Sequence, residues 1–467
     1  MDRAHSLDTL RGFAIIAMIF SGTIGSGKLP AWMYHAQVGP RSGFSFDPNI
    51  YGITWVDIVF PFFLFAMGAA FPFSIGKKIE KEVSYLLLVW DSLLRGFKLA
   101  YFAIFIQHIY PWVLSYPENY YSWGVSLLSF VLMFFMFSEI NFKKNRILGK
   151  LLKLSAYIIG IIMLQTVDYA DERTFSLYNS NIIIMVLANM AIFASIIYIF
   201  TYNRPMRRLL VLPFIMAVLL GSSTENSWVK SIYDFTPVSW FYSFSYLKYL
   251  FIVIPGSIVG EYLKNWNIER KLQSEPHRNP VEHYYIYIML LSLMIIVSNI
   301  YGLYMRYLLP NFIVTIFLLI LLYFLLLKKD ANFVYWRKLY VFGAYLLVLG
   351  LFFEAYEGGI RKDYSTYSYY FVTSGLACFA MIVFSIVSDI YNIKWVKFLE
   401  RVGQNPMIAY VAPQLVVIPL IGILGMRDIV ELLNTTAVLG LLKGVLLTTL
   451  SVTVAIICTK NKFFWRT

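Results

Sequence analysis

Apolar stretches recur along the whole chain, separated by short polar segments. Because about 20 apolar residues suffice for a helix to cross a hydrocarbon core of about 30 Å, each stretch can span a membrane once. No polar segment is long enough for a separate soluble domain. The pattern predicts an all-α fold, a polytopic transmembrane helix bundle in which residues 1–467 form a single membrane domain of about 12–14 spans. The expected spans are residues 9–27, 53–75, 96–114, 121–138, 151–167, 181–201, 207–222, 246–263, 283–303, 308–327, 338–355, 369–390, 405–424 and 436–457.

Composition supports the same class. Only 14% of the 467 residues are charged and 59% are hydrophobic, with a mean hydropathy of +0.66, whereas soluble domains are about 25% charged. The net charge is +13, but no soluble face alternates basic and aromatic residues, so the expected partner is the lipid bilayer and no nucleic acid. Cys378 and Cys458 both lie in apolar stretches, which excludes a disulfide framework. The first stretch, which begins near Thr9, lacks a small-residue cleavage site and is expected to be a retained helix.

Basic residues gather in every second turn between the expected spans. Such a bias marks the cytoplasmic loops of a membrane protein, so both termini are expected in the cytoplasm. The same rule explains each basic side chain without any ligand. The clusters are Lys77, Lys78 and Lys81; Lys143, Lys144 and Arg146; Arg204, Arg207 and Arg208; Lys328 and Lys329; Lys394, Lys397 and Arg401; and Lys460 and Lys462.

The loops on the opposite side, residues 28–52, 223–245 and 356–368, are longer and rich in Trp, Tyr, Pro, Asp and Gly. Aromatic residues alone would be interfacial anchors. Acidic residues among them predict a polar cavity that faces outward. No internal repeat is evident, so the inverted-repeat signature of many secondary transporters is missing. The acidic residues are Asp234, Glu354, Glu357 and Asp363.

Two pairs of residues near the N-terminus could carry chemistry. Asp8 and Arg11 are spaced i, i+3 and share a helical face; they are either a helix-end anchor or a place where Arg11 grips a phosphate. Asp57 lies inside the second span, where an ionisable group is costly and usually functional. A carboxylate of this kind could orient His35, from the preceding loop, for general-base work; the alternative is a solvated loop histidine.

Elimination narrows the choice of histidine. In this topology three of the five histidines, His5, His277 and His283, fall on the cytoplasmic side. His35 and His108 fall on the outer side. His108 follows a helix at the interface and is the second candidate for the same role.

Several motifs resemble the heparan-alpha-glucosaminide N-acetyltransferase family and, more narrowly, its bacterial domain-of-unknown-function relatives (DUF5009-like). They occupy residues 1–115 and 355–467, whereas residues 120–350 match only as hydrophobic spans. The motifs are SLDTLRG at 6–12, His35-Ala36, GITWVDIVFPFFLFAMG at 52–68, EGGIRKDYSTYSY at 357–369, GQNPMIAY at 403–410 and KFFW at 462–465.

The resemblance implies a transmembrane acyltransferase of a bacterial inner membrane. Such an enzyme moves an acetyl group from cytosolic acetyl-CoA, without a metal, to an amino sugar or other glycan outside. The family's catalytic histidine matches His35, and Asp57 would support it. Asn405 matches a polar position of the family's late helix and could donate to an oxyanion, or it is an interhelical hydrogen bond. Ser21 stands where the family has an asparagine, and residues 37–51 lengthen the gap between histidine and aspartate.

The remaining roles follow from this mechanism. Basic residues on the inner side are expected to hold the CoA phosphates: Arg11, Lys77, Lys78, Lys397 and Arg401. Residues near the outer mouth are expected to contact the acceptor: Trp55, Asp234, Glu357, Arg361 and Asp363.

Two rival functions stay open. One is a transporter or flippase for a glycan-related or other polar substrate, and the other is an assembly factor for envelope glycans with a degenerate site. A homodimer is compatible with the sequence.

Overall fold

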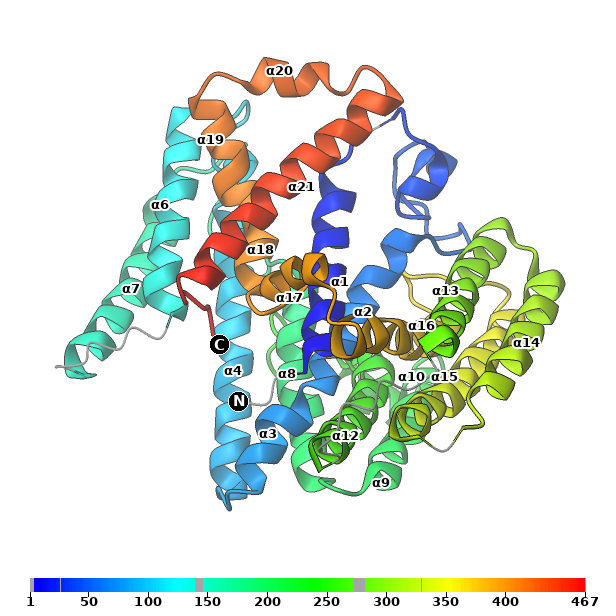
Figure 1. The fold of residues 1–467 in the computed structure, drawn as a ribbon. Coiled ribbons are helices and arrows are strands. Elements are labelled where there is room, and N and C mark those ends of the chain that lie inside the picture. The colour runs from blue at the N-terminus through cyan, green and yellow to red at the C-terminus, as the bar shows by residue number, and fades with distance from the viewer. Residues whose placement is uncertain (1–3, 26, 139–145, 273–281, 329, 467) are drawn as a thin grey trace.

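The structure is a computed structural model that describes residues 4–25, 27–138, 146–272, 282–328 and 330–466. Within these ranges every regular element is a helix (Figure 1). Eleven helical stretches of the described residues, some of which join two or three consecutive helices, are long and apolar enough to cross a membrane. The prediction of a polytopic, all-helical membrane bundle is confirmed. His277, Lys143, Lys144 and Lys329 lie outside the described residues.

The helices follow one another in chain order. The first third contains α1 (His5–Thr23), α2 (Trp55–Ala69), α3 (Phe71–Ile79), α4 (Tyr85–His108), α5 (Pro111–Leu114), α6 (Tyr120–Phe137) and α7 (Arg146–Thr166). The middle contains α8 (Ile182–Phe200), α9 (Pro205–Leu209), α10 (Val211–Gly221), α11 (Trp228–Asp234), α12 (Leu250–Leu272), α13 (Glu282–Met305) and α14 (Leu308–Leu325). The last third contains α15 (Ala331–Tyr356), α16 (Tyr367–Phe384), α17 (Lys397–Gly403), α18 (Pro406–Ala412), α19 (Ile418–Ile423), α20 (Arg427–Leu432) and α21 (Ala437–Lys460).

Short tight or wide turns complete the framework. The 3-10 helices are η1 (Ala31–Met33), η2 (Pro40–Ser42), η3 (Phe244–Tyr249) and η5 (Lys394–Val396). Two π-helical turns, η4 (Ser385–Ile390) and η6 (Pro413–Val417), interrupt the chain after α16 and α18. Turns of this wide kind often lie at functional sites.

Three expected spans are not among the eleven. α1 and α4 are long helices, but α1 carries Asp8 and Arg11, and α4 carries three charged residues. The expected span at 207–222 is divided at Leu210 into α9 and α10. Pro213 cannot donate to the carbonyl of Leu209 and its ring crowds that group, and α9 ends at Leu209. The 11 residues of α10 then rise only about 16 Å.

The interior of the bundle is formed by α2, α8, α12 and α16. In the most apolar segment of each of these spans, 72% to 83% of the residues are buried. These helices lie at the centre of Figure 1, with the α6–α7 pair on one side and α13 and α14 on the other. In the corresponding segments of α7 and α14, only 17% and 28% of the residues are buried. The peripheral helices therefore present most of their apolar side chains outward, as helices in contact with lipid do.

Two glycines bring α1 against α17. A Cβ added to Gly12 would lie 1.9 Å from the carbonyl oxygen of Leu399, and one added to Gly403 would lie 1.9 Å from that of Asp8. Small residues allow helix backbones to approach this closely within a membrane. The crossing places Arg11 beside the C-terminal quarter of the chain, where its Nη1 donates to the carbonyl of Gly403 at 3.3 Å.

Candidate functional site

The loop that carries His35 is fixed from both sides. Ile24, Leu29 and Met33 form a small apolar cluster that packs against Phe20, Tyr34 and Trp55. The hydroxyl of Tyr34 donates to the carbonyl of Gly25 at 2.6 Å. These contacts hold the chain that follows α1 against the start of α2, so the position of His35 is defined by packing.

Asp57 is the third residue of α2 and is fully buried. Its Oδ2 accepts from the backbone N–H of Thr54 at 2.8 Å and from that of Ala36 at 3.3 Å. Thr54 in turn caps the helix by accepting from the N–H of Val56 at 3.2 Å, which makes the pair a capping box. One carboxylate oxygen of Asp57 is thus committed to the backbone, and Oδ1 is left to face the histidine.

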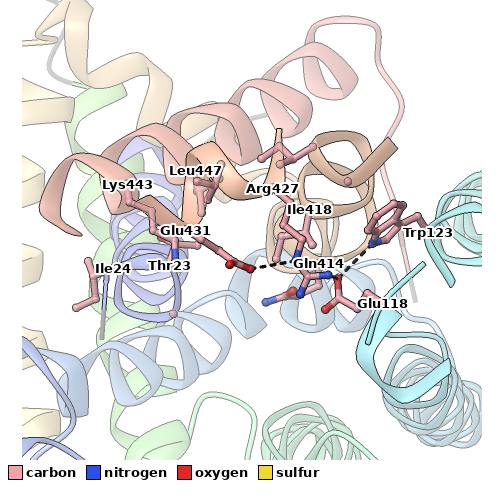
Figure 2. A pocket seen from close by; sticks show the side chains of 14 residues that line it. Thr23, Ile24, Glu118, Trp123, Gln414, Ile418, Arg427, Glu431, Lys443 and Leu447 are labelled. Carbon is pink, nitrogen blue, oxygen red and sulfur yellow. Dashed lines mark hydrogen bonds and ion pairs between the residues drawn. The ribbon is translucent and has the colours of Figure 1, made fainter. Parts of the chain in front are cut away.

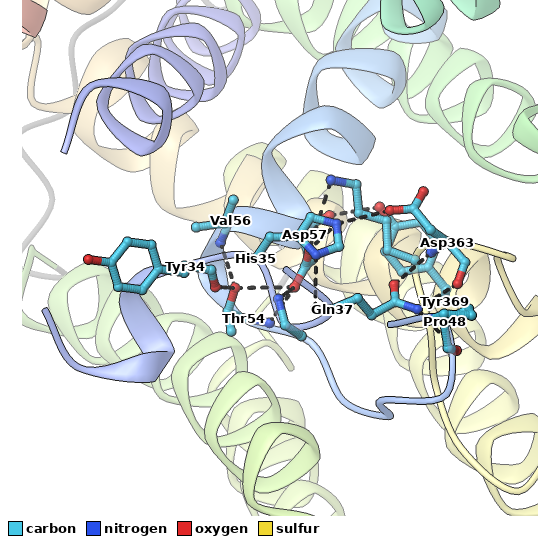
Figure 3. A network of polar contacts seen from close by, with 11 residues as sticks. Tyr34, His35, Gln37, Pro48, Thr54, Val56, Asp57, Asp363 and Tyr369 are labelled. Carbon is cyan, nitrogen blue, oxygen red and sulfur yellow. Dashed lines mark hydrogen bonds and ion pairs between the residues drawn. The ribbon is translucent and has the colours of Figure 1, made fainter. Parts of the chain in front are cut away.

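His35 lies between two carboxylates (Figure 3). Its Nε2 is 3.3 Å from Oδ1 of Asp57 and 3.1 Å from Oδ2 of Asp363. The Nζ of Lys362 is 3.9 Å from the same Oδ1. The structure therefore brings together His35, Asp57 and Asp363, three of the residues singled out from the sequence, although residues 37–51 lengthen the connection between the first two.

The partners of the ring define its tautomer. Nδ1 accepts from the backbone N–H of Gln37 at 3.0 Å, so in the neutral ring Nε2 carries the proton and faces the two carboxylates. By the logic of a histidine oriented by an acid, the nitrogen opposite the carboxylate is the one that takes a proton from a substrate. Nδ1 is therefore the basic atom, once its local contact with Gln37 opens.

Asp363 belongs to the loop between α15 and α16 and is the more accessible carboxylate, with 45% of its side chain exposed. Burial raises the pKa of the Asp363 carboxyl. The hydrogen bond from His35 and the positive charges of Lys362 and His35 lower this pKa by a larger amount, so it lies below its usual range. Asp363 is consequently ionised under ordinary conditions.

Gln37 joins the two loops of the site, although nothing in its sequence context marked it. Its amide donates to the carbonyl of Asp363 at 2.6 Å and to that of Pro48 at 3.3 Å, and its Oε1 accepts from the N–H of Asp363 at 2.9 Å. Gly52 adds a backbone bond to the carbonyl of Ile360 at 2.8 Å. The lengthened segment 37–51 thus braces the loop that carries Asp363.

Most of the other residues expected near the acetyl acceptor are bound to groups of the protein itself. Both oxygens of Glu357 accept from the N–H groups of Tyr367 and Ser368, at 2.7 and 2.9 Å, which caps α16. Arg361 donates to the carbonyl of Pro48 at 3.2 Å. Glu354, expected in an open polar cavity, is buried and paired with Arg306.

Trp55 and Asp234 have different surroundings. Trp55 begins α2 and its ring lies 5.9 Å from that of Phe20. Asp234 is exposed at the end of α11, a helix that packs on α10 and η3. No contact within the described residues joins Asp234 to the His35 network, so the structure does not bring this residue to the site.

His108 is fully buried and both its nitrogens have backbone partners. Nδ1 lies 2.8 Å from the carbonyl of Ile104, and Nε2 accepts from the N–H of Ser176 at 3.2 Å. The rings of Tyr169 and Phe175 flank it. This arrangement fits a structural histidine.

Asn405 lies beside Arg11 and Gly403, whereas His35 follows the opposite end of α1. Its amide nitrogen donates to the carbonyl of Phe463 at 2.7 Å, and its Oδ1 accepts from the N–H of Trp465 at 3.3 Å. The side chain therefore clamps the C-terminal segment. An oxyanion role for Asn405 next to His35 does not fit this geometry.

A large basic cavity of about 760 Å³ opens at the end of the bundle where α1 begins. Its lining contains five cationic side chains and a single acidic one. Of the residues expected to hold phosphates, Arg11 and Lys78 line it, whereas Lys77, Lys397 and Arg401 do not. The cationic lining residues are Arg11, Lys78, Arg95, Lys98 and Arg466, and the acidic one is Asp91.

Two of these cations, Arg95 and Lys98, have no anionic partner among the described residues. Lys78 is paired with Asp91 at 2.7 Å, and Arg11 lies 3.3 Å from Asp8. For Arg95 and Lys98, no hydrogen bond or ion pair to any described residue is found, and Arg95 is repelled by the charge of Arg11. Sequence reasoning missed both, although their i, i+3 spacing at the head of an apolar stretch was the available signal. The cavity thus offers unneutralised positive charge to an anion.

A narrow apolar cavity adjoins the basic one and extends it into the bundle between α1, α2, α8 and α18. The two cavities share a set of lining residues, and the apolar one reaches Phe60, which lies three residues from Asp57 in α2. The volume of this apolar slot is about 20 Å³, little more than one water molecule needs, and its lining does not include His35, Asp57 or Asp363. The shared residues are Phe63, Leu99, Leu187, Pro406 and Met407.

The described residues contain no group of three or more His, Cys, Asp or Glu side chains that could hold a metal ion. A family model described as a domain of unknown function, DUF5009, matches residues 3–263, more than half of the 467 residues. The chain belongs to the DUF5009 family. No curated protein matches the sequence.

The region matched in this DUF5009 protein contains α1, His35, Asp57 and the α4 cations. It ends inside α12, so its boundary does not divide two folding units. Asp363 and Asn405 lie beyond it. The DUF5009 region therefore provides the histidine and the cavity wall, and the rest of the chain completes the acidic side of the site.

Proposed function

We propose that this DUF5009 protein is an acetyl-CoA-dependent transmembrane acetyltransferase. It moves an acetyl group from acetyl-CoA in the basic cavity to the amine or hydroxyl of an amino sugar or other glycan at the end of the bundle that holds His35. The observation that carries the proposal is the basic cavity itself, in which Arg95 and Lys98 carry positive charge that no described acidic residue neutralises. The pyrophosphate and phosphate groups of a CoA are ligands of matching charge.

The adjoining apolar slot marks the route that the proposal requires for the pantetheine arm. A pantetheine arm is long, narrow and uncharged, and Phe63, Leu99 and Met407 would move apart to admit it, because the slot has a volume of about 20 Å³. The slot lies between α1 and α2 and reaches Phe60, close to Asp57. A nucleotide held by Arg95 and Lys98 would therefore direct its thioester toward the His35 network.

At the far end His35 supplies the base. The acceptor nitrogen or oxygen attacks the thioester carbonyl and forms the new C–N or C–O bond, while Nδ1 of His35 takes the proton of the acceptor. The C–S bond then breaks, and the CoA thiolate leaves and is protonated by the imidazolium. Asp57 and Asp363, at 3.3 and 3.1 Å from Nε2, hold the ring and stabilise its charged form.

The sidedness of the reaction is part of the proposal. Clusters of Lys and Arg mark the cytoplasmic side of a bacterial inner membrane, and the end with Arg11, Lys78 and Arg466 carries such a cluster. Both termini and the basic cavity then face the cytoplasm, where acetyl-CoA is made. His35 faces the opposite compartment.

The test is mass spectrometry of glucosamine-containing glycans after incubation with the purified protein and isotopically labelled acetyl-CoA. We expect label on the glycan with the wild-type protein and none with His35→Ala. A protein that binds no acetyl-CoA and transfers no label contradicts the proposal. Substrate-dependent ion flux in liposomes without acetyl-CoA would favour a transporter instead.

A further inference from the structure

A second cavity, separate from the basic one, lies between α1, α6, α19, α20 and α21 (Figure 2). It has a volume of about 220 Å³, many times the space of about 10–15 Å³ that one water molecule needs. Thr23 and Ile24 line it at the C-terminal end of α1, so it lies at the same end of the bundle as His35. The proposed acetyl transfer assigns it no role.

The charged side chains of this cavity neutralise one another. Arg427 lies 3.6 Å from Glu118 and 3.3 Å from Glu431, and Lys443 donates to Asn434 at 3.1 Å. The lining therefore contains two carboxylates and two cations, with no formal net charge. A charged ligand would leave an uncompensated charge in a partly enclosed space, which is costly. The cavity favours an uncharged ligand.

The cavity nevertheless contains open hydrogen-bonding capacity of both kinds. The Oε1 of Gln414 is enclosed and has no hydrogen-bond partner among the described residues. Gln414 stands in the π-helical turn η6, which widens the backbone just where this side chain meets the cavity. Several other enclosed polar atoms among the described residues lack a partner, but of these residues Gln414 is the one that lines this cavity.

Lys443 offers the complementary capacity. An ammonium group has three donors, and the single hydrogen bond found for Lys443 in the described structure goes to Asn434. The cavity thus presents an acceptor on one wall and donors on another. A hydroxyl group both donates and accepts, so several hydroxyls on one ring would satisfy both walls at once.

We infer that this cavity is a binding site for an uncharged, hydroxyl-rich ligand, namely a sugar unit, distinct from the site of acetyl transfer. The carbonyl of Gln414 accepts from one hydroxyl of the sugar, and the ammonium of Lys443 donates to another. The inference does not depend on the acetyltransferase proposal, because none of the residues in the basic cavity or the His35 network lines this one.

The experiment is saturation-transfer NMR of the full-length protein in detergent with N,N′-diacetylchitobiose, and with tetramethylammonium and glutamate as charged probes. We expect binding of the disaccharide and none of the charged probes. Gln414→Met keeps the length of the side chain but removes the acceptor, and should weaken sugar binding about fivefold or more, the loss expected for one hydrogen bond.

Gln107→Met is the matched control, since Gln107 is half-buried in α4 and lines neither cavity; it should leave sugar binding unchanged. Lys443→Gln provides a second variant if Gln414→Met does not fold, and should also weaken binding. Absence of sugar binding at millimolar concentration would overturn the inference. So would wild-type sugar binding by both Gln414→Met and Lys443→Gln, or preferential binding of a charged probe.

Discussion

His35 and His108 lie toward the same end of the bundle, where α1 and α4 finish, but their surroundings differ in kind. His35 stands in a loop and faces two carboxylates, one of which lies 3.9 Å from the ammonium of Lys362. His108 is enclosed by aromatic rings and bonded only to backbone groups. A histidine becomes a proton carrier when charged groups can stabilise both of its states, and only the first environment provides them.

The largest expected effect comes from removing the first of these rings. His35→Ala should lower acetyl transfer by at least about 10²-fold, the usual contribution of a general base, as measured with labelled acetyl-CoA. Size-exclusion profiles in detergent should remain monodisperse. Wild-type transfer by this variant would remove His35 from the mechanism.

Changes in the basic cavity should have the next largest effect. Arg95→Gln together with Lys98→Gln should weaken acetyl-CoA binding tenfold or more, because each change removes a charge-assisted contact. Calorimetry in detergent measures this. Lys77→Gln is the matched control, because Lys77 lies outside the cavity, and it should bind like the wild type. If the control loses as much affinity as the double variant, binding depends on general charge and not on this cavity.

The second histidine should show the opposite profile to the first. His108→Ala leaves a cavity in the core and a backbone N–H of Ser176 without its acceptor, at a cost of about 2–4 kcal/mol in the free energy of unfolding. Transfer per folded molecule should stay near the wild-type value. Denaturation curves and transfer rates measured on the same preparation separate the two outcomes. An inactive but fully stable His108→Ala protein would exchange the roles assigned to the two rings.

The sequence could predict much of this contrast, for reasons that are visible in particular residues. A buried Asp57 three residues after Thr54 is both a capping box and a costly charge, so its importance was predictable from local spacing. Asp363 could be named as an acidic loop residue, but its contact with His35 depends on the Gln37 bridge across 326 positions of sequence. Long-range pairing of this kind leaves no local pattern.

Some roles could not be chosen from the sequence because one residue type serves two purposes. Asn405 was compatible with an oxyanion donor or a structural hydrogen bond, and in the structure it holds the C-terminal segment. Arg95 and Lys98 looked like the edge of an apolar span because α4 extends ten residues and more beyond its predicted start, to Tyr85. Within the expected crossing at 207–222 the helix is interrupted at Leu210, between α9 and α10. Hydropathy counts apolar residues and does not register these backbone interruptions.

The smallest expected effect concerns pH. Since the pKa of Asp363 is lowered in the folded protein, its ionised form contributes stability above its ordinary pKa of 3.8, and this contribution is lost as the pH falls through the lowered value. Wild-type melting temperatures should therefore decline more steeply below about pH 4 than those of Asp363→Asn. Parallel acid limbs in the two proteins would mean that the contact with His35 does not stabilise the fold.

In the proposed reaction an acetyl group passes through the bundle from the basic cavity to the His35 end. Sealed proteoliposomes of fixed protein orientation test it most directly, with labelled acetyl-CoA supplied only on the side of the basic cavity and a glucosamine acceptor trapped on the other. With the wild-type protein we expect labelled acceptor in the trapped compartment, and with His35→Ala we expect none. Transfer only when both compounds are on the same side of the membrane would contradict it.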